Sequence, residues 1–375
     1  MSNHVKTAIV YDWIDKWGGV ERILLIVHRL FPHADFFTSC VDFEKAPWAK
    51  EIPIKTSFIQ QLPAVIRSNR ILSLPFYPYG FEALNLNEYR LVISISSSFA
   101  KSVITKPGTV HISYILTPMR YVWLYPDFYT NSWIKRIAIS PYVSYLKKWD
   151  FVAAQRPDHL LAISRTVASR CESFYHRRSN VLYPPFDERY WSNIGIHASK
   201  PRLASNYFLV VSRLEPYKSI DLVIRAFNKL KKNTLVIIGE GSKERYLKRI
   251  SGSNVRFLKR VTDQELAGYY CHAQALIMPQ EEDFGYVALE AQFFGCPVIA
   301  FQKGGAVETV IEGKTGIFFD RQDEVSLRNA IERYHTISYN LSANTKIHGI
   351  NSVARFGKTM FEDNLMKFIS SKLTT

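Results

Sequence analysis

Short apolar runs alternate with amphipathic segments along most of the chain. The apolar runs predict strands at residues 5–11, 91–95, 111–116, 160–163, 207–212, 234–239, 255–258, 275–278, 298–301 and 316–319. Segments between them, such as 219–231 and 242–250, have the apolar spacing of helices. Strands that alternate with helices indicate an α/β protein in which parallel sheets carry helices on both faces.

One stretch interrupts this alternation. Residues 181–206, VLYPPFDERYWSNIGIHASKPRLASN, contain a double proline followed by a polar segment. A chain of 375 residues is longer than one core usually grows, so two domains are expected. We therefore predict two Rossmann-like halves that join near residue 195.

The charge balance is basic, with 48 Lys and Arg against 33 Asp and Glu. This excess favours an anionic partner: nucleic acid, a membrane surface or a phosphorylated small molecule. Residues 1–195 carry 23 basic and 15 acidic residues, which leaves 25 and 18 for the rest. Because the excess is spread evenly, it argues against a nucleic-acid-binding protein. No GxGxxG opens a helix after the first strand, which argues against a Rossmann oxidoreductase.

The four cysteines lie far apart and show no metal-ligand spacing. This pattern indicates a reducing compartment and argues against a zinc site or a disulfide framework. The N-terminal apolar stretch is too short for a signal peptide, and no window approaches the length of a membrane span. We therefore expect a cytoplasmic protein.

Strand-to-helix turns are where ligands bind in such folds, and three of them have suggestive residues. Gly18 and Gly19 follow the first strand, and paired glycines let backbone N–H groups approach an anion at a helix N-terminus. A tight turn without a ligand is the alternative. Arg213 and Lys218 flank Pro216 and together could clamp a diphosphate, although solvated surface charges are common for both residue types.

The third turn has the sequence PQEEDFGYVALEA, residues 279–291. Glu281 and Asp283 suit a solvated helix N-terminus. Glu282 and Glu290 are eight residues apart, a little over two helical turns, so both can face the same way. Glu290 lies in an apolar run, where an ionised group needs a partner, and a ribose diol would satisfy it.

Several segments together resemble a known family. In the second half these are SRLEPYK, IIGEG, EEDFGYVALEA with its E-x7-E pattern, GGAVETV and GKTGIFF. They resemble the retaining glycosyltransferases of family 4, whose GT-B fold has two Rossmann-like parallel-sheet domains facing across a cleft. In the first half, GGVER, VISISSSFAKSVI, TPMRYVW, RTVASR and VLYPPFD are similar to the subgroup of bacterial O-antigen and exopolysaccharide mannosyltransferases.

The resemblance implies an organisation and an activity. Residues 1–195 would bind the acceptor, residues 196–355 would bind a nucleotide sugar, and residues 356–375 would form a helix that returns to the first domain. The implied enzyme is a retaining, metal-independent hexosyltransferase without a cofactor. Its donor is expected to be GDP-mannose, with UDP-sugars or other GDP-sugars as alternatives, and its acceptor a lipid-linked or polysaccharide glycan of the cell surface.

Roles also carry over residue by residue. Arg213 and Lys218 would neutralise the diphosphate, Glu282 would contact the donor sugar and Glu290 would hold the ribose. Arg213, Lys218 and Glu282 are the implied catalytic residues. The remaining implied contacts are backbone N–H groups, those of Gly18 and Gly19 on the phosphates from the first domain and those of Phe284, Gly285, Tyr286 and Val287 on the sugar and phosphate.

The chain departs from the family pattern at two positions. Many relatives have a histidine before TPMRY that contacts the donor sugar, whereas this chain has Leu116. Ser219 stands where relatives often have glycine. His111 is expected to be a packed strand histidine rather than a substitute ligand. Leu116 therefore leaves the choice of donor sugar open.

A basic aromatic segment is the last candidate, at residues 133–156. It contains five basic residues (135, 136, 147, 148 and 156) and one acidic residue, Asp150. Four further residues fall at helical spacing: Tyr142, Tyr145, Trp149 and Val152. Such a face suits an anionic membrane surface, which would make the protein peripheral on the inner face of the cytoplasmic membrane. A helix packed on its own domain explains the pattern equally well.

Overall fold

The computed structural model describes residues 5–125, 133–199, 201 and 206–373. It divides the chain into two compact units: unit 1 comprises Met1–Pro184 and Phe361–Thr375, and unit 2 comprises Pro185–Met360. The chain thus enters unit 2 between the two prolines, before the polar stretch that suggested a boundary at residue 195. It leaves unit 2 after Met360 rather than after residue 355. Within the stretch 181–206, residues 200 and 202–205 lie outside the described residues.

Unit 1 contains a seven-stranded parallel sheet of order β3-β2-β1-β4-β5-β6-β7. The strands are β1 (Thr7–Tyr11), β2 (Asp35–Thr38), β3 (Ile54–Thr56), β4 (Leu91–Ser96), β5 (Val110–Ile115), β6 (His159–Ala162) and β7 (Asn180–Val181). The strands β2, β3 and β7 were not predicted from the sequence. The order reverses between β1 and β4, which makes this sheet doubly wound.

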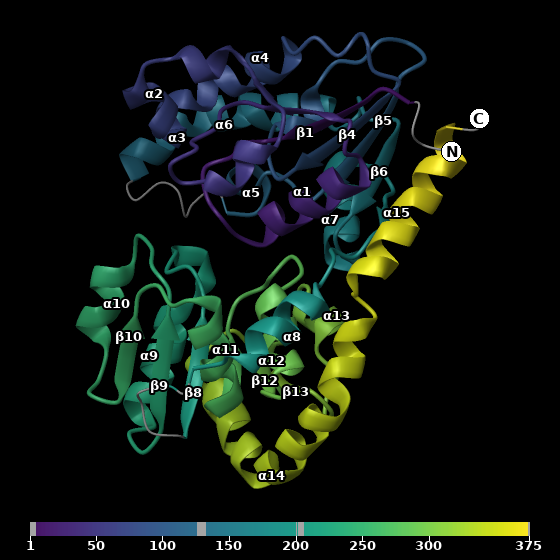
Figure 1. The fold of residues 1–375 in the computed structure, drawn as a ribbon. Coiled ribbons are helices and arrows are strands. Elements are labelled where there is room, and N and C mark those ends of the chain that lie inside the picture. Colours follow the sequence, from purple (N-terminus) through teal and green to yellow (C-terminus); the bar gives the residue numbers. More distant parts are fainter. Residues whose placement is uncertain (1–4, 126–132, 200, 202–205, 374–375) are drawn as a thin grey trace. The chain divides into compact units, whose positions relative to one another are not determined.

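Helices lie between these strands, and one more follows at the C-terminus (Figure 1). They are α1 (Gly19–Leu30), α2 (Ala64–Ser68), α3 (Arg70–Ser73), α4 (Tyr77–Glu82), α5 (Arg120–Trp123), α6 (Trp133–Ala153), α7 (Arg165–Tyr175) and α15 (Lys358–Leu373), with short 3-10 turns η1 (Pro47–Glu51), η2 (Phe58–Gln61), η3 (Leu74–Phe76) and η4 (Ala100–Ser102). The C-terminal helix α15 packs on strands of unit 1, because the ring of Phe361 lies 6.1 Å from that of Tyr114 and Phe368 lies 5.9 Å from His159.

A buried carboxylate joins the carboxyl ends of β1 and β4. Asp12, directly after β1, is fully buried. Its Oδ1 accepts hydrogen bonds from the backbone N–H groups of Phe99 and Ala100, both at 2.7 Å. Its Oδ2 accepts from the backbone N–H and the hydroxyl of Ser97, at 2.6 and 2.8 Å. Four donors satisfy the buried charge, so Asp12 fixes the turn after β4 to the end of β1.

Unit 2 contains a six-stranded parallel sheet of order β10-β9-β8-β11-β12-β13. The strands are β8 (Tyr207–Val211), β9 (Thr234–Ile238), β10 (Val255–Leu258), β11 (Ala273–Met278), β12 (Val298–Phe301) and β13 (Gly316–Phe319). The helices are α8 (Glu188–Ile196), α9 (Ile220–Lys229), α10 (Glu244–Ile250), α11 (Asp263–His272), α12 (Tyr286–Phe293), α13 (Ala306–Thr309) and α14 (Glu324–Ala354), with the 3-10 turn η6 (Pro216–Lys218).

Both faces of the unit 2 sheet are buried, which explains its continuous apolar strands. Phe208 and Val210 of β8 point into one core with α9, α10 and α14. Tyr207 and Leu209 point into another core with α11, α12 and α13. Successive side chains of a strand alternate between faces, so a strand that is buried on both faces is apolar at successive positions.

The two crossings between the units lie side by side. Phe186 and Gly357 form a parallel bridge, in which the N–H of Phe186 donates to the carbonyl of Phe356 at 2.7 Å and the N–H of Lys358 donates to the carbonyl of Phe186 at 3.1 Å. The chain therefore enters and leaves unit 2 at one point.

We predict that Asp12→Ala lowers the free energy of unfolding by about 3 kcal/mol, because it leaves buried N–H groups without an acceptor. Urea denaturation followed by circular dichroism measures this loss. Asp363→Ala, which removes an exposed carboxylate from α15, is the control and should leave the midpoint unchanged. Equal midpoints for both variants would contradict the role given to Asp12.

Candidate functional site

The strand order of unit 2 reverses between β8 and β11. In open α/β sheets, ligands bind outside the carboxyl ends of the strands at this reversal. The turn after β8 has Arg213 and Lys218, and the turn after β11 has Glu282. Three of the predicted site residues thus come from the two turns that flank the reversal.

The turn after β8 presents its two cations differently. Pro216 opens η6, and the turn ends at Ser219, whose φ of 51° lies in the left-handed region that favours glycine. Lys218 is 7% exposed. Arg213 is exposed, and its guanidinium donates to the hydroxyl of Tyr217. Of the two cations expected to bind the diphosphate, Lys218 is therefore desolvated, while Arg213 lies at the surface.

Gly239 and Gly241 of the segment IIGEG pack against the backbone of this turn. A Cβ on Gly239 would lie 1.9 Å from the carbonyl oxygen of Ser212, and one on Gly241 would lie 2.5 Å from that of Leu214. The Leu214 N–H donates to the carbonyl of Glu240 at 2.9 Å. Because backbone packs directly on backbone, no larger residue fits at either glycine.

The two turns meet in an ion pair. The ammonium of Lys218 contacts Oε1 of Glu282, and the side-chain amide of Gln280 donates to the same oxygen at 2.7 Å. Gln280 is 4% exposed. The sequence did not single out Gln280, and its place directly after the proline that ends the strand was the only signal for it. The structure thus brings Lys218 and Glu282 together.

A second pair of glycines lies behind Glu282. The N–H of Gly305 donates to the carbonyl of Glu282 at 2.6 Å, and Gly304 forms a parallel bridge with Glu282. A Cβ on Gly304 would lie 2.4 Å from that carbonyl oxygen, and one on Gly305 would lie 2.4 Å from the Cα of Phe284. The segment GGAVETV therefore sets the position of the acidic turn.

The start of α12 holds the residues predicted to offer backbone N–H groups. Gly285 is the N-cap and has a φ of 91°. Phe284 is buried against Phe356, while Tyr286 and Val287 are half-buried. Asp283 is only 6% exposed, so the expectation that it is a solvated residue is wrong. Its neighbour Glu281 is half-buried.

Glu290 has a partner within the protein. Its side chain is buried in α12, and its Oε2 accepts a hydrogen bond of 2.9 Å from the hydroxyl of Tyr270 on α11. The partner that the buried carboxylate needs is thus supplied in part by Tyr270, and a ribose contact stays a prediction. A carboxylate accepts several hydrogen bonds, so Glu290 can still bind a hydroxyl.

The glycine pair belongs to unit 1, whereas the other predicted donor contacts belong to unit 2. Gly18 is the N-cap of α1 without a side-chain cap, and Gly19 is the first helical residue. A Cβ on Gly18 would lie 3.0 Å from Oε2 of Glu21. Burial raises the pKa of Glu21, whose Oε1 lies 3.5 Å from the hydroxyl of Tyr11.

His111 lies near the start of β5 in unit 1, and Leu116 lies just beyond its end. Leu116 directly follows β5, is 5% exposed, and its N–H donates to the carbonyl of Ser96 at 2.8 Å. His111 is fully buried, its Nε2 lies 2.8 Å from the hydroxyl of Ser94, and burial lowers its pKa to about 3. The expectation of a packed strand histidine matches this environment.

The basic aromatic segment splits between core and surface. Tyr142 and Trp149 pack against the core of unit 1, and Trp149 donates to Glu82 at 3.1 Å. Tyr145 and Val152 are exposed, at 48% and 55%. Lys147 and Lys148 are exposed as well, and Arg156 is half-buried, whereas the side chains of Lys135 and Arg136 lie outside the described part of the structure.

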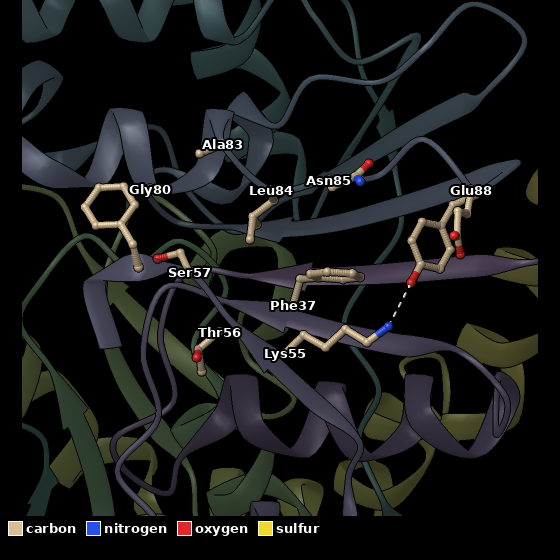
Figure 2. Close-up of a pocket in the computed structure, with 11 residues that line it drawn as sticks. Phe37, Lys55, Thr56, Ser57, Gly80, Ala83, Leu84, Asn85 and Glu88 are labelled. Atoms are coloured by element: carbon tan, nitrogen blue, oxygen red, sulfur yellow. Dashed lines mark hydrogen bonds between the residues drawn. The ribbon is translucent and has the colours of Figure 1, made fainter. Parts of the chain in front are cut away.

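A cavity of about 450 Å³ lies elsewhere in unit 1 (Figure 2). It is lined by β2, β3 and residues 80–89, and it contains none of the predicted site residues. Its charges are paired internally, since Lys55 lies 3.0 Å from Asp35 and Glu88 contacts Lys6. No role in the candidate site follows from it.

Among the residues that the structure describes, no group of three or more His, Cys, Asp or Glu side chains is placed to hold a metal ion. None of the helices in the described ranges is long and apolar enough to cross a membrane.

The second half of the chain, which contains this site, matches a known protein family. Residues 196–349 match the sequence model of the family described as glycosyl transferases group 1. The chain therefore carries the domain of glycosyl transferases group 1, and the family resemblance seen in the sequence is confirmed.

Two curated relatives are mannosyltransferases by name. The GDP-mannose-dependent alpha-(1-6)-phosphatidylinositol monomannoside mannosyltransferase of Mycolicibacterium smegmatis is 33% identical over 138 residues, which cover 32% of this chain and 36% of the relative. The alpha-1,3/1,6-mannosyltransferase ALG2 of Mus musculus is 28% identical over 255 residues, which cover 57% of this chain and 58% of the relative. The matches thus span from about a third to somewhat over half of these relatives.

The fold has solved counterparts. HepE of Anabaena, in complex with UDP and glucose, aligns with a TM-score of 0.70 over 98% of this chain and 100% of its own, at 17% sequence identity. The prediction of the GT-B fold class, with two Rossmann-like parallel-sheet domains, is confirmed.

We predict that Gly304→Ala lowers the free energy of unfolding by about 2–4 kcal/mol, because left-handed strain adds to overpacking against Glu282. Gly313→Ala is a matched control, since Gly313 has a φ of 72°, close to the 70° of Gly304, but open space around its Cβ position. Strain alone should cost this control about 1 kcal/mol. Equal losses in urea denaturation would show that crowding at Glu282 is unimportant.

Proposed function

We propose that the protein is a retaining glycosyltransferase that transfers a sugar from a nucleotide diphosphate sugar to a lipid-linked or polysaccharide acceptor. The observation that carries this proposal is the Lys218–Glu282 pair, which joins the two turns at the strand-order reversal of unit 2. Unit 2 is proposed to bind the donor and unit 1 the acceptor.

Lys218 and Arg213 are proposed to bind the diphosphate. Breaking the bond between the anomeric carbon and the phosphate increases the negative charge on the leaving group, so preorganised cations lower the barrier. At an effective dielectric near 20, two unit charges about 4 Å apart attract each other by roughly 4 kcal/mol. Only the part of this attraction that grows in the transition state contributes to the rate. Lys218 is suited to this role because its ammonium is already desolvated.

The carboxylates are proposed to bind rather than to attack. Glu282 would accept hydrogen bonds from the donor sugar, and its Oε1 is already engaged by Lys218 and Gln280. Glu290, held by Tyr270, would accept from the ribose hydroxyls. Retention then follows from same-face attack, with the donor phosphate taking the acceptor's proton. Cationic side chains and the N–H groups of Phe284–Val287 would supply the charge stabilisation without a metal.

GDP-mannose is the proposed donor. The two mannosyltransferase relatives support it, and the mycobacterial one is GDP-mannose-dependent by name. UDP-sugars are the second candidate, because HepE was solved with UDP and glucose. The buried Leu116 cannot donate or accept a hydrogen bond through its side chain, so sugar selection would depend on other groups.

We predict that wild-type protein is stabilised by one class of nucleotide sugar in a calorimetric panel of GDP- and UDP-sugars, and that Lys218→Ala reduces turnover of that donor by about 10²–10³-fold. Arg213→Ala should also reduce turnover. Lys259→Ala, an exposed cation of the same unit, is the control. Circular dichroism verifies folding, and full turnover by a folded Lys218→Ala variant would refute the diphosphate role.

We also propose that the protein is cytoplasmic and attaches peripherally to the inner face of the membrane through α6. The exposed Tyr145, Lys147, Lys148 and Val152 support this proposal. The inward packing of Tyr142 and Trp149 leaves only this part of the segment to face a lipid surface.

We predict that Lys147→Glu/Lys148→Glu weakens binding to anionic vesicles at least about thirtyfold, since each cation contributes about 1 kcal/mol. Vesicle co-sedimentation measures the effect, with neutral vesicles as a reference. Lys231→Glu/Lys232→Glu makes the same charge change at an exposed pair in unit 2 and should bind as wild type does. Unchanged binding of the α6 variant would favour a helix that only packs on its own domain.

A further inference from the structure

Unit 1 contains a buried ion pair between Lys101 and Asp150. Neither residue is among those proposed to bind the donor. Lys101 of η4 and Asp150 of α6 are 1% and 0% exposed, and Nζ of Lys101 lies 2.5 Å from Oδ1 of Asp150. The other oxygen, Oδ2, accepts hydrogen bonds from the indole N–H of Trp123 at 2.7 Å and from the hydroxyl of Tyr175 at 2.8 Å. Both oxygens of Asp150 are therefore engaged.

The partners of Asp150 come from separate elements. Lys101 lies in the segment after β4, Trp123 ends α5 in the segment after β5, and Tyr175 ends α7. The ring of Trp123 also lies edge-on to that of Tyr175, with centroids 5.8 Å apart. One carboxylate on α6 thus ties together two segments that leave the carboxyl edge of the sheet.

The same turn after β4 is held from its other side. Asp12 binds the backbone of residues 97–100, and Lys101 follows directly. A continuous chain of hydrogen bonds and charges therefore runs from the end of β1, through the turn after β4, to Asp150 and Trp123. Trp123 is the last residue of this chain of contacts, and the short segment that contains α5 connects it to Leu116.

Stability alone is a poor explanation for this pair. Desolvating two charges offsets most of their attraction, so replacing a buried ion pair by apolar residues of similar size is often neutral or stabilising. Removing only one partner is strongly destabilising, because the other charge stays buried. A buried ion pair is better explained if it selects one local arrangement of the chain over alternative arrangements.

We propose that Lys101 and Asp150 are positioning residues that fix α5 and the segment 116–123 for sugar transfer. The proposal rests on the proposed function, because the turn after β4 and the segment 116–123 both leave the carboxyl edge of the unit 1 sheet, where open α/β sheets bind their ligands. Neither residue touches substrate. Their effect is transmitted by the hydrogen bond that the indole N–H of Trp123 donates to Asp150.

The test is the paired variant Lys101→Met/Asp150→Leu, which removes both charges. We expect it to remain folded with a somewhat lower urea midpoint, because the indole N–H of Trp123 and the hydroxyl of Tyr175 lose their acceptor. It should bind the nucleotide with unchanged affinity and lose at least tenfold in kcat, with little change in the KM for the donor. The surface pair of α10 supplies the control, Lys248→Met/Glu244→Leu, which should keep the wild-type kcat. Wild-type kcat in the folded paired variant would overturn the proposal.

A second readout does not depend on activity. The indole N–H of Trp123, assigned in nitrogen–proton spectra with Trp123→Phe, should exchange slowly in wild type and at least tenfold faster in the paired variant. Unchanged exchange would overturn the proposal, and so would a paired variant that does not fold, since stability would then account for the pair. If wild type turned over no nucleotide sugar, the proposed function would fail, while the exchange of Trp123 would still decide whether the pair holds α5.

Discussion

Burial of the sheets on both faces is the constraint on which the rest of the structure depends. In unit 2, alternate residues of the central strands enter two different cores, so the middle positions of these strands are apolar. A charged side chain is accommodated more readily where strands end. Lys218 and Glu282 follow β8 and β11, and Asp12 follows β1 of unit 1. The location of the candidate chemistry is therefore a consequence of the packing.

Backbone contacts then decide how accurately the turns are held. Gly239 and Gly241 touch the backbone of the turn that holds Lys218, and Gly304 and Gly305 touch that of the turn that holds Glu282. Peptide groups in direct contact have few alternative arrangements, unlike long side chains, which change rotamer. Such rigidity suits a site whose proposed contribution is preorganised charge, because reorganisation during the reaction would reduce the benefit.

The sequence predicted the long buried strands and the motif residues on their turns, because both depend on local patterns. It missed β2, β3 and β7, of which β3 and β7 have three and two residues, too few to show a period. It also missed Asp12 and Gln280, and it did not anticipate the hydrogen bond between Glu290 and Tyr270. Each error concerns contacts between residues distant in sequence: Asp12 with residues 97–100, and Glu290 with Tyr270 on another helix. Hydrophobic periodicity carries no information about such pairs.

The Lys218–Glu282 pair has a consequence for the proposed reaction. Removing a lysine ammonium from water costs free energy. In the folded protein the ion pair with Glu282 already offsets this cost. An ammonium has three N–H donors, so it can keep Glu282 and still donate to a phosphate oxygen. Gln280 donates to the same carboxylate oxygen and disperses part of its negative charge. Lys218 then keeps more of its positive potential for an incoming anion, and the phosphate meets a cation that needs no further reorganisation of water.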